Sequence, residues 1–157
     1  EVVYIDRLES SHSLRLFTET GRRVPVHCTS SGKVLLAFAP DETRETILRT
    51  APLTALTPHT ISELPALREE LARVQSRGWA EAVNERELGI ASVAAPIRDL
   101  HGTVVAAISI GGPLIRFTAT ARRGFVGSVV EAAEAVSRRL GWSLETDIAR
   151  PGIEAFG

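Results

Sequence analysis

The stretch GWAEAVNERELGIASVAAPIRD, which runs from Gly78 to Asp99, is the most informative part of this sequence. Residues 79–83 are compatible with a short strand, the charged residues 84–88 with a turn, and residues 90–97 with a second strand. The second strand carries small apolar residues on both of its faces, so we expect other elements to cover both. Such a strand can line a small-molecule pocket, and Ser92 is the polar side chain that it would offer to a ligand.

The segments on either side of this stretch show strand and helix patterns. Runs of β-forming residues predict strands, and apolar residues at helical spacing after a capping residue predict helices. The expected strands are 2–5, 12–18 and 103–110, and the expected helices follow Thr29, Asp41, Ser62 and Thr118 and end at Pro40, Arg49, Gly78 and Gly141. This order of elements favours an α+β sandwich, in which helices flank a mostly antiparallel sheet.

Length and composition are typical of one globular domain. The chain has 157 residues, of which 44% are hydrophobic and 24% charged, and we expect a single domain over residues 1–157. Its net charge is −1 and its pI is about 6.5. A domain that grips nucleic acid usually has a basic face and a high pI, so we do not expect this chain alone to bind DNA. No apolar run approaches the roughly 18 residues that span a bilayer, and we expect no membrane partner.

Two features concern the origin of the chain. Cys28 is the only cysteine, so no intrachain disulfide can form, which fits the reducing cytoplasm. The sequence begins with Glu1 and contains no methionine, so we expect it to be part of a longer protein with a further segment upstream. No cationic leader followed by an apolar segment opens the sequence, and we do not expect secretion.

Residues suited to catalysis are few. His27 and Cys28 are neighbours, and neighbours on a strand point to opposite faces, so we do not expect them to form a nucleophile–base pair. A core position is the better interpretation for both, and a solvated turn is the better one for Glu85 and Glu87. The four histidines show no metal-ligand spacing, and we expect neither a metal nor another cofactor. A small hydrolase or isomerase that uses Cys28 or Glu85 is the alternative to a binding function.

Residues 29–31, Thr-Ser-Ser, lead directly into a predicted helix. The first main-chain N–H groups of a helix lack internal acceptors, and the helix dipole adds positive potential, so this turn favours anion binding. An ordinary helix cap is the simpler interpretation. Lys33 either strengthens the local field or points to water. Ser92 and Ser109 lie on strands that we expect to be buried, so their hydroxyls need hydrogen-bond partners. These hydroxyls either bond nearby main chain or converge with those of Ser30 and Ser31 on one small acid.

Three blocks of the sequence, taken in order, resemble the effector-binding domain of the IclR family of bacterial transcription regulators. They are VPVHCTSSGKVLLA at residues 24–37, the stretch 78–99, and AAISIGGP at residues 106–113 with the helix that follows. In the second block the family's expected residue types stand at Gly78, Glu85, Ser92, Val93, Ala94, Ile97 and Asp99. The resemblance covers nearly the whole chain.

The resemblance implies a GAF-like (profilin-like) fold and a non-enzymatic domain that senses a metabolite for a transcription regulator. It also implies that DNA is bound only through an N-terminal winged helix-turn-helix domain outside this chain, and that the protein forms a homo-dimer or homo-tetramer. Carried over residue by residue, the family's effector pocket corresponds to Ser13, Leu16, Ser30, Ser31, Ile90, Ser92, Ser109 and Gly111.

Two positions depart from the family's pattern. Ala82 stands where the motif usually has Asp or Ser, and Arg98 stands where it usually has an aromatic residue or His. The lack of a polar group at Ala82 removes a hydrogen-bonding partner and opens space. We therefore expect a carboxylate effector larger than glyoxylate or pyruvate, with an apolar body, such as an aromatic or sugar-derived acid.

Overall fold

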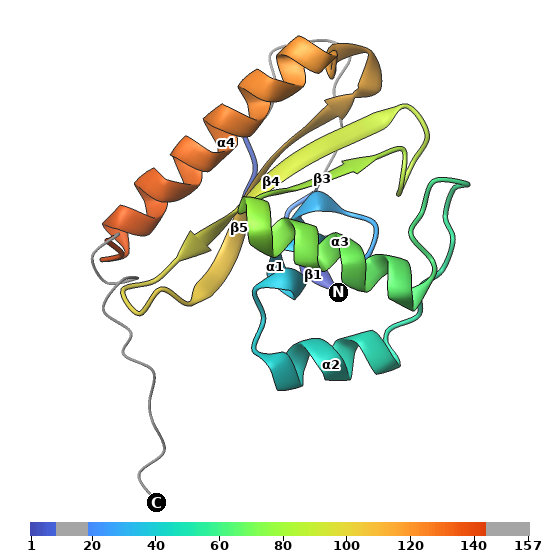
Figure 1. Ribbon diagram of the computed structural model, residues 1–157. Coiled ribbons are helices and arrows are strands. Elements are labelled where there is room, and N and C mark those ends of the chain that lie inside the picture. Colours follow the sequence, from blue (N-terminus) through green and yellow to red (C-terminus); the bar gives the residue numbers. More distant parts are fainter. Residues whose placement is uncertain (9–18, 144–157) are drawn as a thin grey trace, which may run out of the picture.

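The computed structural model describes residues 1–8 and 19–143 and shows a layered α+β arrangement (Figure 1). Two short strands pair antiparallel near the N-terminus, three helices follow, and a three-stranded antiparallel sheet of order β3-β4-β5 precedes the last helix. The elements are β1 (Val2–Val3), β2 (Arg23–Val24), α1 (Ser30–Ala37), α2 (Asp41–Thr50), α3 (Leu64–Arg77), β3 (Ala80–Val83), β4 (Ile90–Arg98), β5 (Val104–Pro113), a 3-10 turn (Leu114–Arg116) and α4 (Ala119–Arg139).

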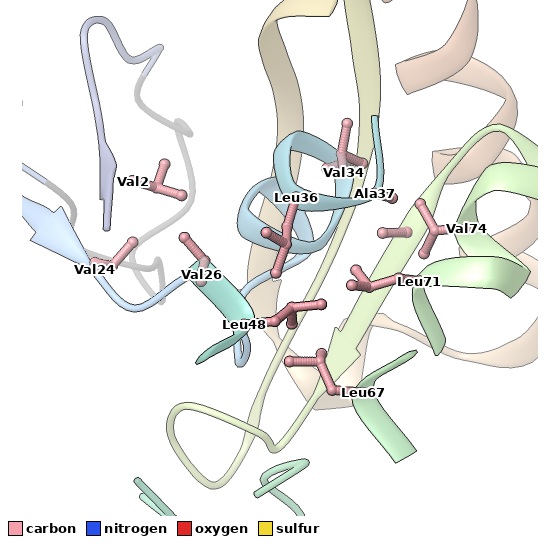
Figure 2. Close-up of a cluster of buried hydrophobic side chains, with 12 residues drawn as sticks. Val2, Val24, Val26, Val34, Leu36, Ala37, Leu48, Leu67, Leu71 and Val74 are labelled. Carbon is pink, nitrogen blue, oxygen red and sulfur yellow. The ribbon is translucent and has the colours of Figure 1, made fainter. Parts of the chain in front are cut away.

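Helix α4 covers one face of the three-stranded sheet, and α1 and α3 lie on the other (Figure 1). On β4, Val93 and Ala95 pack with residues of α4, whereas Ala94 packs with residues of α1 and α3. The expectation that both faces of this strand are covered is therefore confirmed. The core on the second face also contains apolar residues of β1, β2 and α2, such as Val24 and Leu48 (Figure 2).

Local sequence signals explain several of the helix ends. The hydroxyls of Thr29 and Thr118 each accept a hydrogen bond from the main-chain N–H three residues later, at the starts of α1 and α4. Gly78 ends α3 with a φ of 81°, a left-handed conformation that glycine adopts without strain. These two caps and this stop agree with the sequence-based expectation.

The structure differs from that expectation at the start of α3 and in the length of β1. Helix α3 begins after Glu63, which makes no side-chain cap bond, so the expected cap at Ser62 is wrong. Strand β1 covers only Val2–Val3 rather than residues 2–5. The strand expected at 12–18 lies outside the described residues. In the part of the chain that is described, no helix is both long and apolar enough for a membrane span.

Candidate ligand-binding site

The first turn of α1 is buried inside the domain. The side chains that follow its cap are almost inaccessible, with Ser30 1% exposed and Ser31 5% exposed. Gly32 allows this close packing, since a Cβ atom there would lie 2.2 Å from the main-chain oxygen of Val26. The main-chain N–H groups of Ser30 and Ser31 find no acceptor among residues 1–8 and 19–143. Two donors in a buried turn, at the positive end of the helix dipole, therefore need a partner.

A hydrogen bond joins this turn to the sheet. The Ser30 hydroxyl donates to the Ser92 hydroxyl oxygen on β4, over 2.8 Å. Because Ser92 accepts this bond, its own proton is free for another acceptor. Ser92 lies between Ala82 on β3 and Gly111 on β5 in the strand register. The neighbours of Ser92 thus supply neither a polar group nor a bulky side chain.

The predicted pocket residues on the sheet share the face that α1 covers. Ser92 pairs with Gly111 and Ala94 pairs with Ser109, and directly paired residues of antiparallel strands point to the same face. Ile90 is two residues before Ser92 and lies on this face as well. The structure therefore brings together the predicted residues of α1, β4 and β5.

The predicted pocket residues of β5 lie at the surface. Ser109 and Gly111 are exposed, so the expectation that Ser109 lies in a buried strand is wrong. The reason is that β5 is an edge strand, paired only with β4 in the described part of the chain. Ser13 and Leu16, the remaining predicted pocket residues, lie outside the described residues.

Lys33 and Glu85 form a buried ion pair beside this turn. Lys33 Nζ lies 2.6 Å from Glu85 Oε1 and 3.0 Å from the main-chain oxygen of Glu81. Lys33 is 1% exposed and Glu85 is 8% exposed. The interpretation of Glu85 as part of a solvated turn is therefore wrong, because the turn after β3 folds back onto α1. The signal that sequence reasoning missed is the position of the only lysine of the chain within an apolar helix.

The turn that carries Glu85 is held from a second side. The hydroxyls of Thr57 and Thr60 donate to the main-chain oxygens of Asn84 and Glu85. Burial raises the pKa of the Glu85 carboxyl group, while the Lys33 ammonium group beside it acts in the opposite direction. Because Lys33 is paired with Glu85, the donors that lack a partner at this turn are N–H and O–H groups of the described residues rather than the Lys33 ammonium group.

The candidate nucleophile is a core residue. Cys28 is fully buried, and burial raises the pKa of its thiol, so the thiolate needed for nucleophilic attack is disfavoured. His27 is also buried, and its Nε2 atom lies 3.0 Å from the main-chain oxygen of Thr54. The Nδ1 atom of His27 has no partner among the described residues. The expected core positions of His27 and Cys28 are confirmed.

Comparison with known proteins identifies the family. Residues 1–138 match the family described as "Bacterial transcriptional regulator IclR C-terminal". The chain belongs to this family. Among curated relatives, the HTH-type transcriptional regulator KdgR of Dickeya chrysanthemi is 36% identical over 141 residues, which are 90% of this chain and 46% of that protein. The chain spans about half the length of the curated relatives it matches.

Solved structures of transcription regulators share the fold. The crystal structure of the Thermotoga maritima IclR is 36% identical with a TM-score of 0.84, over 89% of this chain and 57% of that one. The inducer-binding domain of the PobR transcription factor from Acinetobacter, solved as a double mutant in complex with 3-hydroxybenzoic acid, is 27% identical with a TM-score of 0.69, over 79% of this chain and 69% of that one. The fold is thus the α+β, GAF-like fold of IclR C-terminal domains, and its relatives are transcription regulators rather than enzymes.

Proposed function

We propose that this chain is the effector-binding domain of a transcription regulator and binds a small organic carboxylate at the start of α1. The main support is the buried first turn of α1, where the N–H groups of Ser30 and Ser31 lack acceptors and the Ser92 hydroxyl lies alongside. A carboxylate accepts several hydrogen bonds at once, and charge-assisted bonds of this kind are the stronger ones.

The other donors at the site suit the same ligand. The hydroxyls of Ser31 and Ser109 make no hydrogen bond within the described residues, and the proton of Ser92 has no acceptor there either. The proposed hydrogen-bond donors are thus three hydroxyl groups and two main-chain N–H groups. None of them belongs to a lysine or arginine side chain. Such a site selects an anion by hydrogen bonding and the helix dipole.

The surroundings of Ser92 favour a ligand with an apolar body. Ala82 and Gly111 flank Ser92 on the two neighbouring strands, and Ile90 lies on the same face. The PobR domain, a relative of this chain, was solved with 3-hydroxybenzoic acid. We therefore place an aromatic carboxylate first and a sugar-derived acid second, ahead of glyoxylate and pyruvate.

In this proposal, ligand binding changes the affinity for DNA through parts of the protein outside this chain and through the arrangement of its subunits. In this proposal DNA is held by an N-terminal domain outside the chain, in the cytoplasm, and the chain forms a homo-dimer or homo-tetramer. A ligand changes DNA affinity only if it binds one arrangement of that assembly more tightly than another.

Calorimetric titration of the chain with 3-hydroxybenzoate, glyoxylate and pyruvate tests the ligand class. We expect saturable binding of 3-hydroxybenzoate and much weaker binding of the two small oxoacids. Tight binding of glyoxylate or pyruvate alone would contradict the proposed apolar body of the ligand.

Ser92→Leu is expected to weaken carboxylate binding at the start of α1 at least about 100-fold, because it removes a hydrogen bond to a charged group and puts a larger side chain beside Ala82; the amide signals of Ser30 and Ser31 distinguish this site from any other. Ser128→Leu on the exposed side of α4 is the matched control and should bind as the parent does. Calorimetry measures both affinities, and circular dichroism checks that both variants fold. Parental affinity in the Ser92→Leu variant would remove this residue from the site.

Cys28→Ala separates a sensor from an enzyme. Because Cys28 is buried and lies outside the proposed contacts, we expect ligand affinity to stay within about twofold and stability to fall by about 1 kcal/mol. Calorimetry and urea unfolding measure these two quantities. A complete loss of ligand binding in a folded Cys28→Ala chain would contradict the assignment.

A further inference from the structure

A cavity lies between the C-terminal ends of α3 and α4, at an edge of β4. Its volume is about 300 Å³, the lower end of the range of about 300–1000 Å³ for small-molecule pockets. Strand β3 begins at Ala80, which pairs with Ala94, so the part of β4 beyond Ala94 has no described partner strand on that side. Ala95 and Pro96 of this uncovered part line the cavity. None of the lining residues belongs to the site at the start of α1.

The lining carries an excess of positive charge. Arg77 and Arg98 both line the cavity. Arg77 is paired with Glu70 over 3.0 Å, whereas the Arg98 guanidinium lies over the Phe38 ring, 5.0 Å from its centre, and donates to the main-chain oxygen of Gly102. Arg98 has no carboxylate within ion-pair distance in the described part of the chain. The acidic residue of the lining, Glu134, is already paired with an arginine of its own helix. Arg98 is also one of the two departures from the IclR motif, and the α1 site does not use it.

Trp142 adds an unsatisfied donor to the same cavity. The residue is 8% exposed, and its Nε1 atom has no acceptor among the described residues. A buried N–H group without an acceptor is unfavourable, so the indole is a donor that lacks a partner. Ser137, which also lines the cavity, is satisfied, because its hydroxyl donates to Ala133 and accepts from the N–H of Arg98.

We propose that this cavity binds a second small carboxylic acid, whose carboxylate accepts hydrogen bonds from Arg98 and Trp142. The apolar body of the acid packs against Ala95, Val130 and Ala133, which line the same space. A guanidinium group without a carboxylate partner, a buried indole N–H and apolar walls together suit a monoanion with a hydrophobic part. A ligand here contacts α3, β4 and α4 at once, on the opposite side of β4 from β5.

Nuclear magnetic resonance of the ¹⁵N-labelled chain with benzoate tests the proposal. The chain has two tryptophans, so comparison with Trp79→Phe assigns the indole signal of Trp142. The titration uses the Ser92→Leu chain, in which the α1 site is disabled, and the parent beside it. We expect the Trp142 indole proton to move downfield and to saturate with the same affinity in both chains, because the indole gains an acceptor.

Substitution of a residue that lines the cavity provides a second test of benzoate binding. Arg98→Gln should weaken benzoate binding at least about tenfold, since a charge-assisted bond is lost, and Arg98→Lys should retain more affinity. Arg49→Gln, an exposed arginine on α2, is the control and should change nothing.

Three outcomes would overturn the proposal: an unmoved Trp142 signal at saturating benzoate in the parent, unchanged affinity in Arg98→Gln, or equal affinity for inorganic phosphate. The α1 site has its own reporters in the same spectra, the amide signals of Ser30 and Ser31. Movement of those amides without the indole signal in the parent would refute the second site and leave the proposed function intact.

Discussion

Lys33→Met is expected to lower the free energy of unfolding by about 3–5 kcal/mol, because it leaves the Glu85 carboxylate buried without its cation. Lys33 and Glu85 are 1% and 8% exposed, and the ammonium group also donates to the main-chain oxygen of Glu81. Methionine keeps the length and the helix propensity of the side chain and removes only the charge and the donors. Urea unfolding followed by circular dichroism measures the change.

A surface ion pair of the same length is the matched control. Arg68 and Glu45 also meet at 2.6 Å, but their side chains are 43% and 39% exposed. Arg68→Met should therefore lower stability far less than Lys33→Met does, because water screens an exposed ion pair. The double variant Lys33→Met with Glu85→Leu should recover much of the loss, since both buried polar partners are gone. Equal losses for Lys33→Met and Arg68→Met would contradict a dominant role for burial.

The stability of Lys33→Met should also depend on pH. Burial already raises the pKa of Glu85 from its ordinary value of 4.5, and removal of Lys33 removes a group that lowers it. The folded variant then binds a proton more readily than the unfolded chain, so stability falls as the pH rises above the unfolded pKa. The difference between variant and parent should shrink toward pH 4.5 and reach its maximum above the folded pKa of Glu85. A difference that is constant with pH would exclude Glu85 as its source.

Gly32→Ala is expected to lower stability by about 3 kcal/mol and to abolish carboxylate binding at the start of α1, where the amide signals of Ser30 and Ser31 report it. A Cβ atom at this position would lie 2.2 Å from the main-chain oxygen of Val26 and 2.7 Å from Thr29 Oγ1. Because the nearest of these atoms is main chain, the start of α1 must move, and the N–H groups of Ser30 and Ser31 move with it. Urea unfolding and calorimetry with 3-hydroxybenzoate measure the two effects.

A glycine with free space around it is the control for Gly32. Gly124 lies on α4, and an added Cβ atom there meets nothing within 4 Å. Gly124→Ala should raise stability by about 0.5–1 kcal/mol, because alanine has the higher helix propensity, and should leave ligand binding unchanged. Parental ligand affinity in a folded Gly32→Ala chain would show that the geometry of the α1 turn is not what binds the ligand.

Local rules predicted much of the fold. Thr29, Thr118 and Gly78 act where capping chemistry places them, and the small residues of β4 are covered on both faces as their pattern indicates. The cap at Ser62 was wrong because the chain stays extended through Glu63 before α3 begins. Propensity alone does not decide between neighbouring starts when no side chain makes the cap bond.

Contacts between distant residues account for what the sequence could not predict at the site. The bond between Ser30 and Ser92 joins residues 62 positions apart, and the pair of Lys33 and Glu85 joins residues 52 apart. The first joins two of the four hydroxyls that were expected to converge on one ligand, and the second reverses the expectation of a solvated turn. A charged residue in a turn is normally exposed, so only the folded arrangement of α1 against the turn reveals the buried pair.

The most direct test of the central claim is a crystal structure of the chain with 3-hydroxybenzoate. We predict that the ligand carboxylate accepts hydrogen bonds from the main-chain N–H groups of Ser30 and Ser31 and from the Ser92 hydroxyl, at about 2.7–3.2 Å. A start of α1 that holds no carboxylate at saturating ligand, or one that is occupied by the chain's own side chains with the ligand excluded, would contradict it.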